Sequence, residues 1–349
     1  MRECEIVDLH THIVPEEFPT PGGRASADRW PSMDHIATGR ANVMIAGQNF
    51  RTVTETCWNP QRRITDLHVE GAHVQVLSPM PELLSYWMTP NDGLEICRYL
   101  NDFIGRLVDS SPLHFYGLGV VPLQDPDLAA QELSAIKQAG LVGIELGSNI
   151  LGKSLGEERF HAFFEEVERQ NLAVFVHALH PTFADRIVGP EWLDNSVGFQ
   201  TDTGLTISSL LTGGTLDRCP TLRLAFSHGG GTFPWVLPRM QHAWSGTWNE
   251  EPPQPEGHGR PRPMQQLMQR SPLEYARSLY YDTLVFDHRA IRYLLDVIGP
   301  KQLTVGTDYP FVPREQPIAK TLMSMGLTDD DWEDICSRNA LRFLGVADA

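Results

Sequence analysis

The chain has 349 residues, enough for one large α/β barrel or two smaller domains. Its hydrophobic share of 41% is ordinary for a globular protein, and its formal net charge of -16 disfavours nucleic acid or an anionic membrane surface as a partner. The odd number of cysteines, with no C-x-x-C spacing, disfavours a disulfide framework. The N-terminal residues lack a secretory signal and no apolar stretch is long enough to cross a membrane, so we expect a cytoplasmic protein.

Eight short apolar segments recur along the chain and predict buried strands. They are nearly continuous in Val, Ile, Leu and Phe, as expected for a parallel sheet that is covered on both faces. The segments are EIVDLH (5–10), HVQVLS (73–78), FYGLGVVP (115–122), LVGIELG (141–147), LAVFVHA (172–178), LRLAFSH (222–228), SLYYDTLVF (278–286) and LTVGTD (303–308).

Helix signals lie between these segments. Asn59-Pro60 and Asp125-Pro126 each predict a helix start, and the second helix should run to Gly140. Residues 156–170 carry apolar side chains at helical spacing, and residues 328–344 predict a closing helix. Eight alternations of strand and helix predict an α/β protein with a (β/α)8 barrel, a single domain over residues 1–349. An open doubly wound sheet is the alternative, but no G-x-G-x-x-G follows the first strand.

Two segments interrupt the alternation. Residues 16–58 are rich in Pro, Gly and polar residues, and we expect an insertion after the first strand that covers the active-site mouth as a lid. Within it, MIAGQNFRTV predicts a hairpin that turns at Gly47-Gln48. Residues 245–272 are proline-rich without clear periodicity and predict a long loop.

Five side chains at predicted strand ends carry the chemistry. His10 and His12 are two residues apart, so they point to the same face of the first strand, while His177, His228 and Asp308 end later strands. A barrel of this kind has its active site at these ends. Three imidazoles and a carboxylate suit Zn²⁺, with Mn²⁺, Co²⁺ or Fe²⁺ as alternatives. We therefore predict His10, His12, His177 and Asp308 as ligands, and His228 as the general base beside a metal-bound water.

The motifs around these residues resemble a known family. DLHTHIVP, VH at 176–177, FSHGGGTFP and VGTDYPF are similar to motifs of the decarboxylase branch of the amidohydrolase superfamily, and the likeness covers Asp8 to Gly345. The resemblance implies a zinc-bearing distorted barrel with a small insertion domain, a homodimer and no organic cofactor. It also places the metal ligands and the acid/base histidine on the same five residues. The fourth strand offers Glu145 where a binuclear hydrolase would have a lysine.

The resemblance extends to substrate contacts. Arg51 matches a residue that holds the substrate carboxylate, Arg239 one that reaches the neighbouring subunit's pocket, and Trp192 a pocket tryptophan. Arginine suits such tasks because its planar fork binds a carboxylate with two parallel hydrogen bonds. Phe50 is a further candidate for the pocket wall. In the hydroxybenzoate members of the branch, the Asp308 position is itself the proton donor, so Asp308 is also a catalytic candidate.

The function implied is that of a metal-dependent carboxy-lyase in aromatic catabolism. Its substrate would be a small unsaturated or aromatic carboxylate of the carboxymuconate-semialdehyde type. The relatives have Pro-Trp-Asp after the fifth-strand histidine, whereas this chain has Ala178-Leu179-His180, which puts substrate identity in doubt more than reaction class. A hydrolase or hydratase on the same scaffold is the main alternative, and an inactive binding protein is the third.

Overall fold

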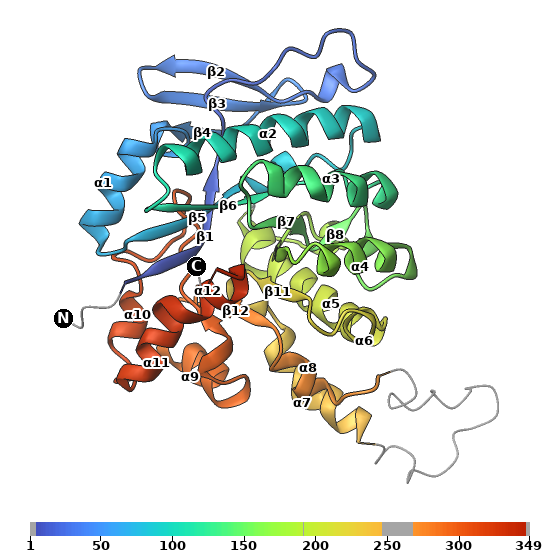
Figure 1. Cartoon of the computed structure of the whole chain (residues 1–349), viewed down its shortest axis with the longest axis vertical. Helices are drawn as coiled ribbons and strands as arrows, with labels where there is room; N and C mark the ends of the chain where they lie inside the picture. The colour runs from blue at the N-terminus through green and yellow to red at the C-terminus, as the bar shows by residue number, and fades with distance from the viewer. Residues whose placement is uncertain (1–4, 191, 246–267, 347–349) are drawn as a thin grey trace.

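Eight parallel strands form a nearly closed barrel at the centre of the molecule (Figure 1). The computed structural model describes residues 5–190, 192–245 and 268–346. All eight predicted segments are strands, and the predicted barrel is confirmed. In order around the sheet they are β1 (Val7–Ile13), β5 (Val74–Pro79), β6 (Phe115–Gly119), β7 (Gly143–Gly147), β10 (Ala173–His177), β11 (Arg223–Phe226), β12 (Tyr280–Asp282) and β13 (Leu303–Thr304).

The first and last strands of the barrel meet. The backbone N–H of Leu9 donates to the carbonyl of Val305 at 2.9 Å, and that of His12 donates to the carbonyl of Tyr309 at 2.7 Å. Closing a sheet on itself removes the unpaired edges that an open sheet would expose. It also brings β1 beside the segment after β13, so that His10 and His12 lie close to Asp308.

Helices surround the barrel. They are α1 (Pro60–Glu70), α2 (Pro90–Ser110), α3 (Pro126–Gln138), α4 (His161–Arg169), α5 (Phe199–Thr212), α6 (Thr215–Arg218), α7 (Phe233–Trp244), α8 (Pro272–Ala276), α9 (His288–Val297), α10 (Lys320–Met323), α11 (Asp329–Glu333) and α12 (Asn339–Leu344). The predicted starts of α1 and α3 are confirmed, because the side chains of Asn59 and Asp125 each accept a hydrogen bond from a backbone N–H of the first turn. The predicted closing helix is α11 and α12, joined by one π turn.

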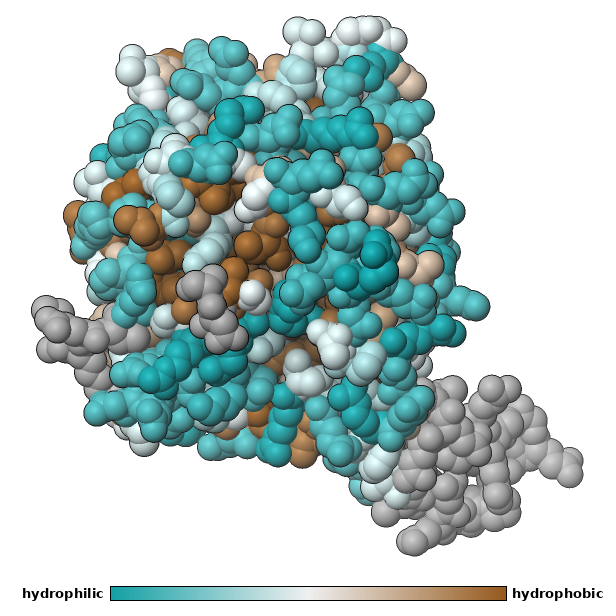
Figure 2. Space-filling model, viewed as in Figure 1, coloured by the Kyte–Doolittle hydropathy of each residue, from teal (hydrophilic) through white to brown (hydrophobic). Residues whose placement is uncertain are grey.

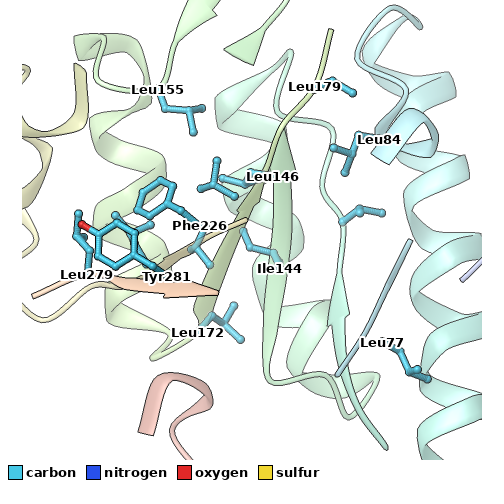
Figure 3. Packing of buried hydrophobic residues seen from close by; sticks show 14 of the residues in the cluster. Leu77, Leu84, Ile144, Leu146, Leu155, Leu172, Leu179, Phe226, Leu279 and Tyr281 are labelled. Carbon is cyan, nitrogen blue, oxygen red and sulfur yellow. The ribbon is translucent and has the colours of Figure 1, made fainter. Parts of the chain in front are cut away.

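Apolar side chains fill both sides of the barrel wall. Ile144 and Leu146 of β7 pack outward among residues such as Phe226 and Tyr281, in the layer between strands and helices (Figure 3). A second cluster joins residues of the strands to the closing helix α12, which contributes Phe343. Buried polar side chains also lie within the strands, among them Asp8 of β1, Gln75 of β5 and Glu145 of β7.

A small antiparallel sheet lies within residues 16–58. Its strands are β2 (Ser32–Ala37), β3 (Arg40–Ile45) and β4 (Gln48–Thr54), and Figure 1 shows it beyond α2 at one end of the molecule. The predicted turn at Gly47-Gln48 is wrong by one residue. The turn is Ala46-Gly47, with φ of 51° and 70°, because a tight hairpin turn of this hand needs positive φ at both central positions and Gln48 already belongs to β4.

The surface has mixed character. Figure 2 shows a face that is largely hydrophilic, with hydrophobic residues gathered in its middle.

A cavity of about 1160 Å³ is lined by Ile6, which precedes β1, by the end of α1 and by residues 317–332. It therefore opens at the N-terminal ends of the strands, opposite the candidate ligands. The four cysteines within the described residues are buried, and Cys4 lies outside them.

Residues 246–267, most of the predicted long loop, lie outside the described residues. Among the helices of the described part, none has the length and apolar character that a membrane span requires.

Candidate metal centre

Four of the predicted side chains converge at the C-terminal end of the barrel. One ligand atom from each of His10, His12, His177 and Asp308 lies within 4.8 Å of the other three. Nε2 of His12 is 3.1 Å from Nε2 of His10 and 3.1 Å from Oδ1 of Asp308. These separations suit one ion with metal–ligand bonds of about 2 Å. The residues come from β1, the end of β10 and the segment after β13, so three separate parts of the chain build the cluster.

The first strand is irregular where it carries the histidines. The pairing of β1 with β5 shifts register between Asp8 and Thr11, so β1 has one more residue there than its partner strand. Such a bulge bends the strand and redirects a side chain, and bulges are frequent next to active sites. Here the irregularity includes His10, whose ring faces His177 and Phe175 inside the barrel.

The three candidate ligand histidines are held in one tautomer. A carboxylate or carbonyl oxygen can only accept, so each Nδ1 carries the proton and donates it. The lone pair of each Nε2 is then free for a metal. Nε2 of His177 is fully buried and has no hydrogen-bond partner among the described residues, which fits a metal ligand. The acceptors are Asp282 Oδ2 for His10 (2.7 Å), Pro79 O for His12 (2.9 Å) and Ala178 O for His177 (2.6 Å).

Asp282 is a further candidate site residue, which the sequence analysis missed. Its Oδ1 accepts hydrogen bonds from the backbone N–H groups of Gly229 and Leu284, both at 3.0 Å, while Oδ2 binds His10. Burial works to raise the pKa of Asp282, but the hydrogen bond and charge of His10 outweigh burial and hold it below its ordinary value. The signal was present in the sequence, since Asp282 ends the seventh predicted strand as His177 ends the fifth.

His228 stands beside the four candidate ligands. It follows β11 in a short turn, with its ring centroid 5.2 Å from that of His10 and 5.3 Å from that of His177. Burial, followed by the charge of His10, lowers the pKa of His228 and favours the neutral ring. Nδ1 of this ring is buried without a hydrogen-bond partner among the described residues. A neutral imidazole in this position can accept a proton from a group bound at the centre.

Two of the five side chains sit on strained backbone. His228 has φ of 55° and Asp308 has φ of 66°, a conformation that residues other than glycine rarely adopt. Strain of this kind costs on the order of 1–3 kcal/mol per residue and clusters at functional sites. The surrounding structure holds Asp308 in place, because its backbone N–H donates to the carbonyl of His10 at 2.8 Å.

Arg51 reaches the edge of the centre from the small sheet. Its guanidinium carbon lies 4.3 Å from the ring centre of Phe311, which in turn stacks on His12 with ring centres 5.7 Å apart. Arg51 has no ion-pair partner in the described part of the chain, so its charge is available to an anion. Phe50 precedes it and is 40% exposed, with its ring centre 5.9 Å from the same guanidinium carbon.

The other predicted substrate contacts are not brought to this centre within one chain. Arg239 is exposed on α7, and Trp192 is 65% exposed in the segment between β10 and α5. His180 is exposed as well, and its carbonyl accepts a hydrogen bond from Asn149.

Two buried carboxyl groups near the centre were not predicted as site residues. Glu82 follows β5 and Glu145 lies on β7, and burial raises the pKa of both side chains. Both oxygens of Glu145 and Oε2 of Glu82 lack a hydrogen-bond partner among the described residues. Glu82 interacts electrostatically with Arg51, His180 and Asp308, which places it on the same side of the barrel as the candidate ligands.

Comparison with known proteins agrees with this geometry. The amidohydrolase family matches residues 7–346. The 2-amino-3-carboxymuconate-6-semialdehyde decarboxylase of Dictyostelium discoideum is 36% identical over 343 residues, which are 97% of this chain and 91% of the relative.

Two solved structures share the fold. The apo structure of the Metarhizium anisopliae IDCase matches with a TM-score of 0.79 at 19% identity, covering 98% of this chain and 97% of that one. A dihydroxybenzoic acid decarboxylase from Polaromonas sp., solved with bound manganese and an inhibitor, matches with a TM-score of 0.74 at 20% identity, covering 99% and 98%. The family match covers nearly the whole chain, and the barrel and the histidine–aspartate cluster agree with it. The chain therefore belongs to the amidohydrolase family, together with the decarboxylase of D. discoideum.

Proposed function

We propose that this protein is a metal-dependent decarboxylase of an unsaturated or aromatic carboxylic acid, of the carboxymuconate-semialdehyde type. The observation that carries the proposal is the cluster of His10, His12, His177 and Asp308 with His228 beside it, in a chain 36% identical to a decarboxylase over most of both lengths. A role in the catabolism of aromatic compounds follows from that substrate class.

The metal that we propose is Zn²⁺, because three imidazoles and one carboxylate are an ordinary zinc donor set. Mn²⁺ is the first alternative, since the structure of the Polaromonas relative contains manganese. When bound, the divalent cation supplies a Lewis acid that stabilises negative charge on the substrate.

The side chains of this protein would supply the remaining steps. Breaking the bond to the carboxylate releases CO₂ and leaves an electron pair on the substrate carbon, which then needs a proton. His228 is placed to take up a proton before cleavage and to return it afterwards, with Asp308 as the alternative donor. Arg51 would hold a substrate carboxylate by a bidentate hydrogen bond.

The first test measures metal and CO₂ together. The purified protein is analysed for bound metals and incubated with carboxymuconate semialdehydes and dihydroxybenzoates, while CO₂ and ultraviolet absorbance are recorded. We expect one metal per chain and CO₂ from at least one acid, lost after treatment with a chelator and restored by Zn²⁺, Mn²⁺ or Co²⁺. One metal per chain with water added to a substrate and no CO₂ would instead assign a hydrolase or hydratase.

We further propose a homodimer in which Arg239 completes the partner's site. Its exposure on α7 supports this, because an exposed side chain is available to a neighbouring subunit. Mixing the variants Arg51→Ala and Arg239→Ala tests the idea. If Arg51 acts within its own subunit and Arg239 across the interface, a mixed dimer has one intact site, and random mixing restores about one site in four. No recovery, with exchange of subunits verified, would contradict action across the interface.

A further inference from the structure

Arg63 is a completely buried guanidinium beneath the first strand. It lies on α1, has 0% relative exposure, and four hydrogen bonds leave its three nitrogens. Nη1 donates to the carbonyls of His12 (2.8 Å) and Thr56 (2.9 Å), Nη2 to the hydroxyl of Thr11 (3.1 Å), and Nε to the side-chain oxygen of Gln75 (3.0 Å). Two of the four bonds therefore fix residues of β1 itself, one of them the peptide of the candidate ligand His12.

The same guanidinium also contacts the segment that carries Asp308. Its carbon lies 4.8 Å from the ring centre of Tyr309, the residue that follows Asp308. The carbonyl of Tyr309 accepts the backbone N–H of His12 at 2.7 Å, and its hydroxyl donates to Asp66, also on α1, at 2.9 Å. His12 is thus held at its N–H by Tyr309 and at its carbonyl by Arg63.

The burial of this charge is not explained by an ion pair. Within the described residues no carboxylate lies within 4.0 Å of Arg63, and burial is the main cause that lowers its pKa from the ordinary value. The charges of Asp8 and Asp66 act on Arg63 from further away and offset the cost of burial only in part, so the guanidinium depends on hydrogen bonds to neutral oxygens. These hydrogen bonds fix the local geometry, because a planar guanidinium with fixed donor directions holds several acceptors in one arrangement.

We infer that Arg63 is a positioning residue of the metal centre, which sets the separation of His12 and Asp308 by binding β1 and the segment after β13 at once. The inference rests on the metal-dependent function proposed above, but it concerns how the metal is held and not which substrate is used. Outer groups that orient metal ligands are worth about 10–100-fold in metal affinity.

Arg314 provides a matched control. Its guanidinium carbon lies 5.1 Å from the ring centre of the same Tyr309, and it forms an ion pair with Glu70 of α1 at 2.6 Å. It makes no hydrogen bond to β1. A variant at Arg314 therefore removes an arginine, a contact with the tyrosine ring and a contact with α1, but leaves the peptide of His12 untouched.

The test compares Arg63→Lys, Arg63→Met and Arg314→Gln in the full-length protein. Each variant is loaded with Co²⁺, and its affinity for Co²⁺, its visible absorption spectrum and its thermal midpoint are measured. Lysine keeps the charge but cannot reach the acceptors of the fork together. We expect both Arg63 variants to bind Co²⁺ about 10–100-fold more weakly with a changed spectrum, and Arg314→Gln to lower the thermal midpoint with Co²⁺ affinity unchanged.

Each other outcome contradicts the inference. Unchanged Co²⁺ affinity and spectrum in a folded Arg63 variant would show that the centre does not depend on this residue. Equal losses of affinity at Arg63 and Arg314 would assign the effect to general destabilisation. If neither Arg63 variant folds, the residue serves the fold and the inference is overturned. These measurements use no substrate. Their results could therefore still be interpreted if no decarboxylation were found with any acid.

Discussion

His228→Ala and His228→Asn should both retain a full complement of metal and lose at least about 100-fold in kcat, the loss expected when a general base is removed. The ring centre of His228 lies about 5 Å from the ring centres of two candidate ligands, but His228 is not one of the four residues of the cluster. Metal binding should therefore survive its loss.

Two variants are needed because of the backbone at this position. With φ of 55°, His228 occupies a conformation that strains alanine, whereas asparagine adopts it readily. A loss of activity common to both variants then reflects the missing imidazole and not relief of strain. His288→Ala, which removes an imidazole that is 68% exposed and is not part of the cluster, is the control and should behave as the unaltered protein. Near-normal turnover in His228→Asn would remove the acid/base role.

His10→Ala should lose metal and activity together. His10 contributes one of the four atoms of the cluster, and its Nδ1 is tied to Asp282 at 2.7 Å. Removing one of four ligands leaves an open position that water fills only weakly, so we expect binding to fall below detection in a metal assay at micromolar protein. Full metal occupancy in His10→Ala would refute the ligand assignment.

The variant Asp282→Asn tests how much the hydrogen bond from His10 to Asp282 contributes to metal binding. The amide of an asparagine can donate to Nδ1 of His10, which favours the tautomer that carries its proton on Nε2, where the metal must bind. We expect metal affinity about 10–100-fold lower than that of the unaltered protein, between those of His10→Ala and the parent. The measurement is a competition against a chelator of known affinity, and circular dichroism of the metal-free variant checks that it remains folded.

The candidate ligands could be predicted because they combine a residue type with a place in the barrel. A histidine or aspartate at the end of an apolar segment is visible in the sequence, and parallel strands bring such ends together. The same signal announced Asp282, which was missed because only histidines and the last aspartate were considered. Which of these histidines bind the metal and which one acts as the base is harder to predict from the sequence. The answer depends on which ring nitrogen points to the centre and which one is hydrogen-bonded to an oxygen.

Arg63 could not be predicted from the sequence. In the segment QRRI it appears as one of two adjacent arginines, and only the packing of α1 against β1 decides that Arg63 is buried while Arg62 is 51% exposed at its side chain. Arg239 and Trp192 show a different limit. The predicted role of Arg239 depends on a second subunit, and that of Trp192 is a place in the pocket wall, but both side chains are exposed in the single chain.

The pairing of β1 with the segment after β13 affects when the metal site can form during synthesis of the chain. Thr307 donates a hydrogen bond to Asp8 at 2.6 Å, although the two residues are 299 positions apart. During synthesis, the growing chain would have His10 and His12 almost from the start, but it could not complete the donor set until nearly all of it had left the ribosome. Contacts of such long range form late and slowly. Tight metal capture would then belong to the finished chain, and an early fragment would carry only part of the chelating group.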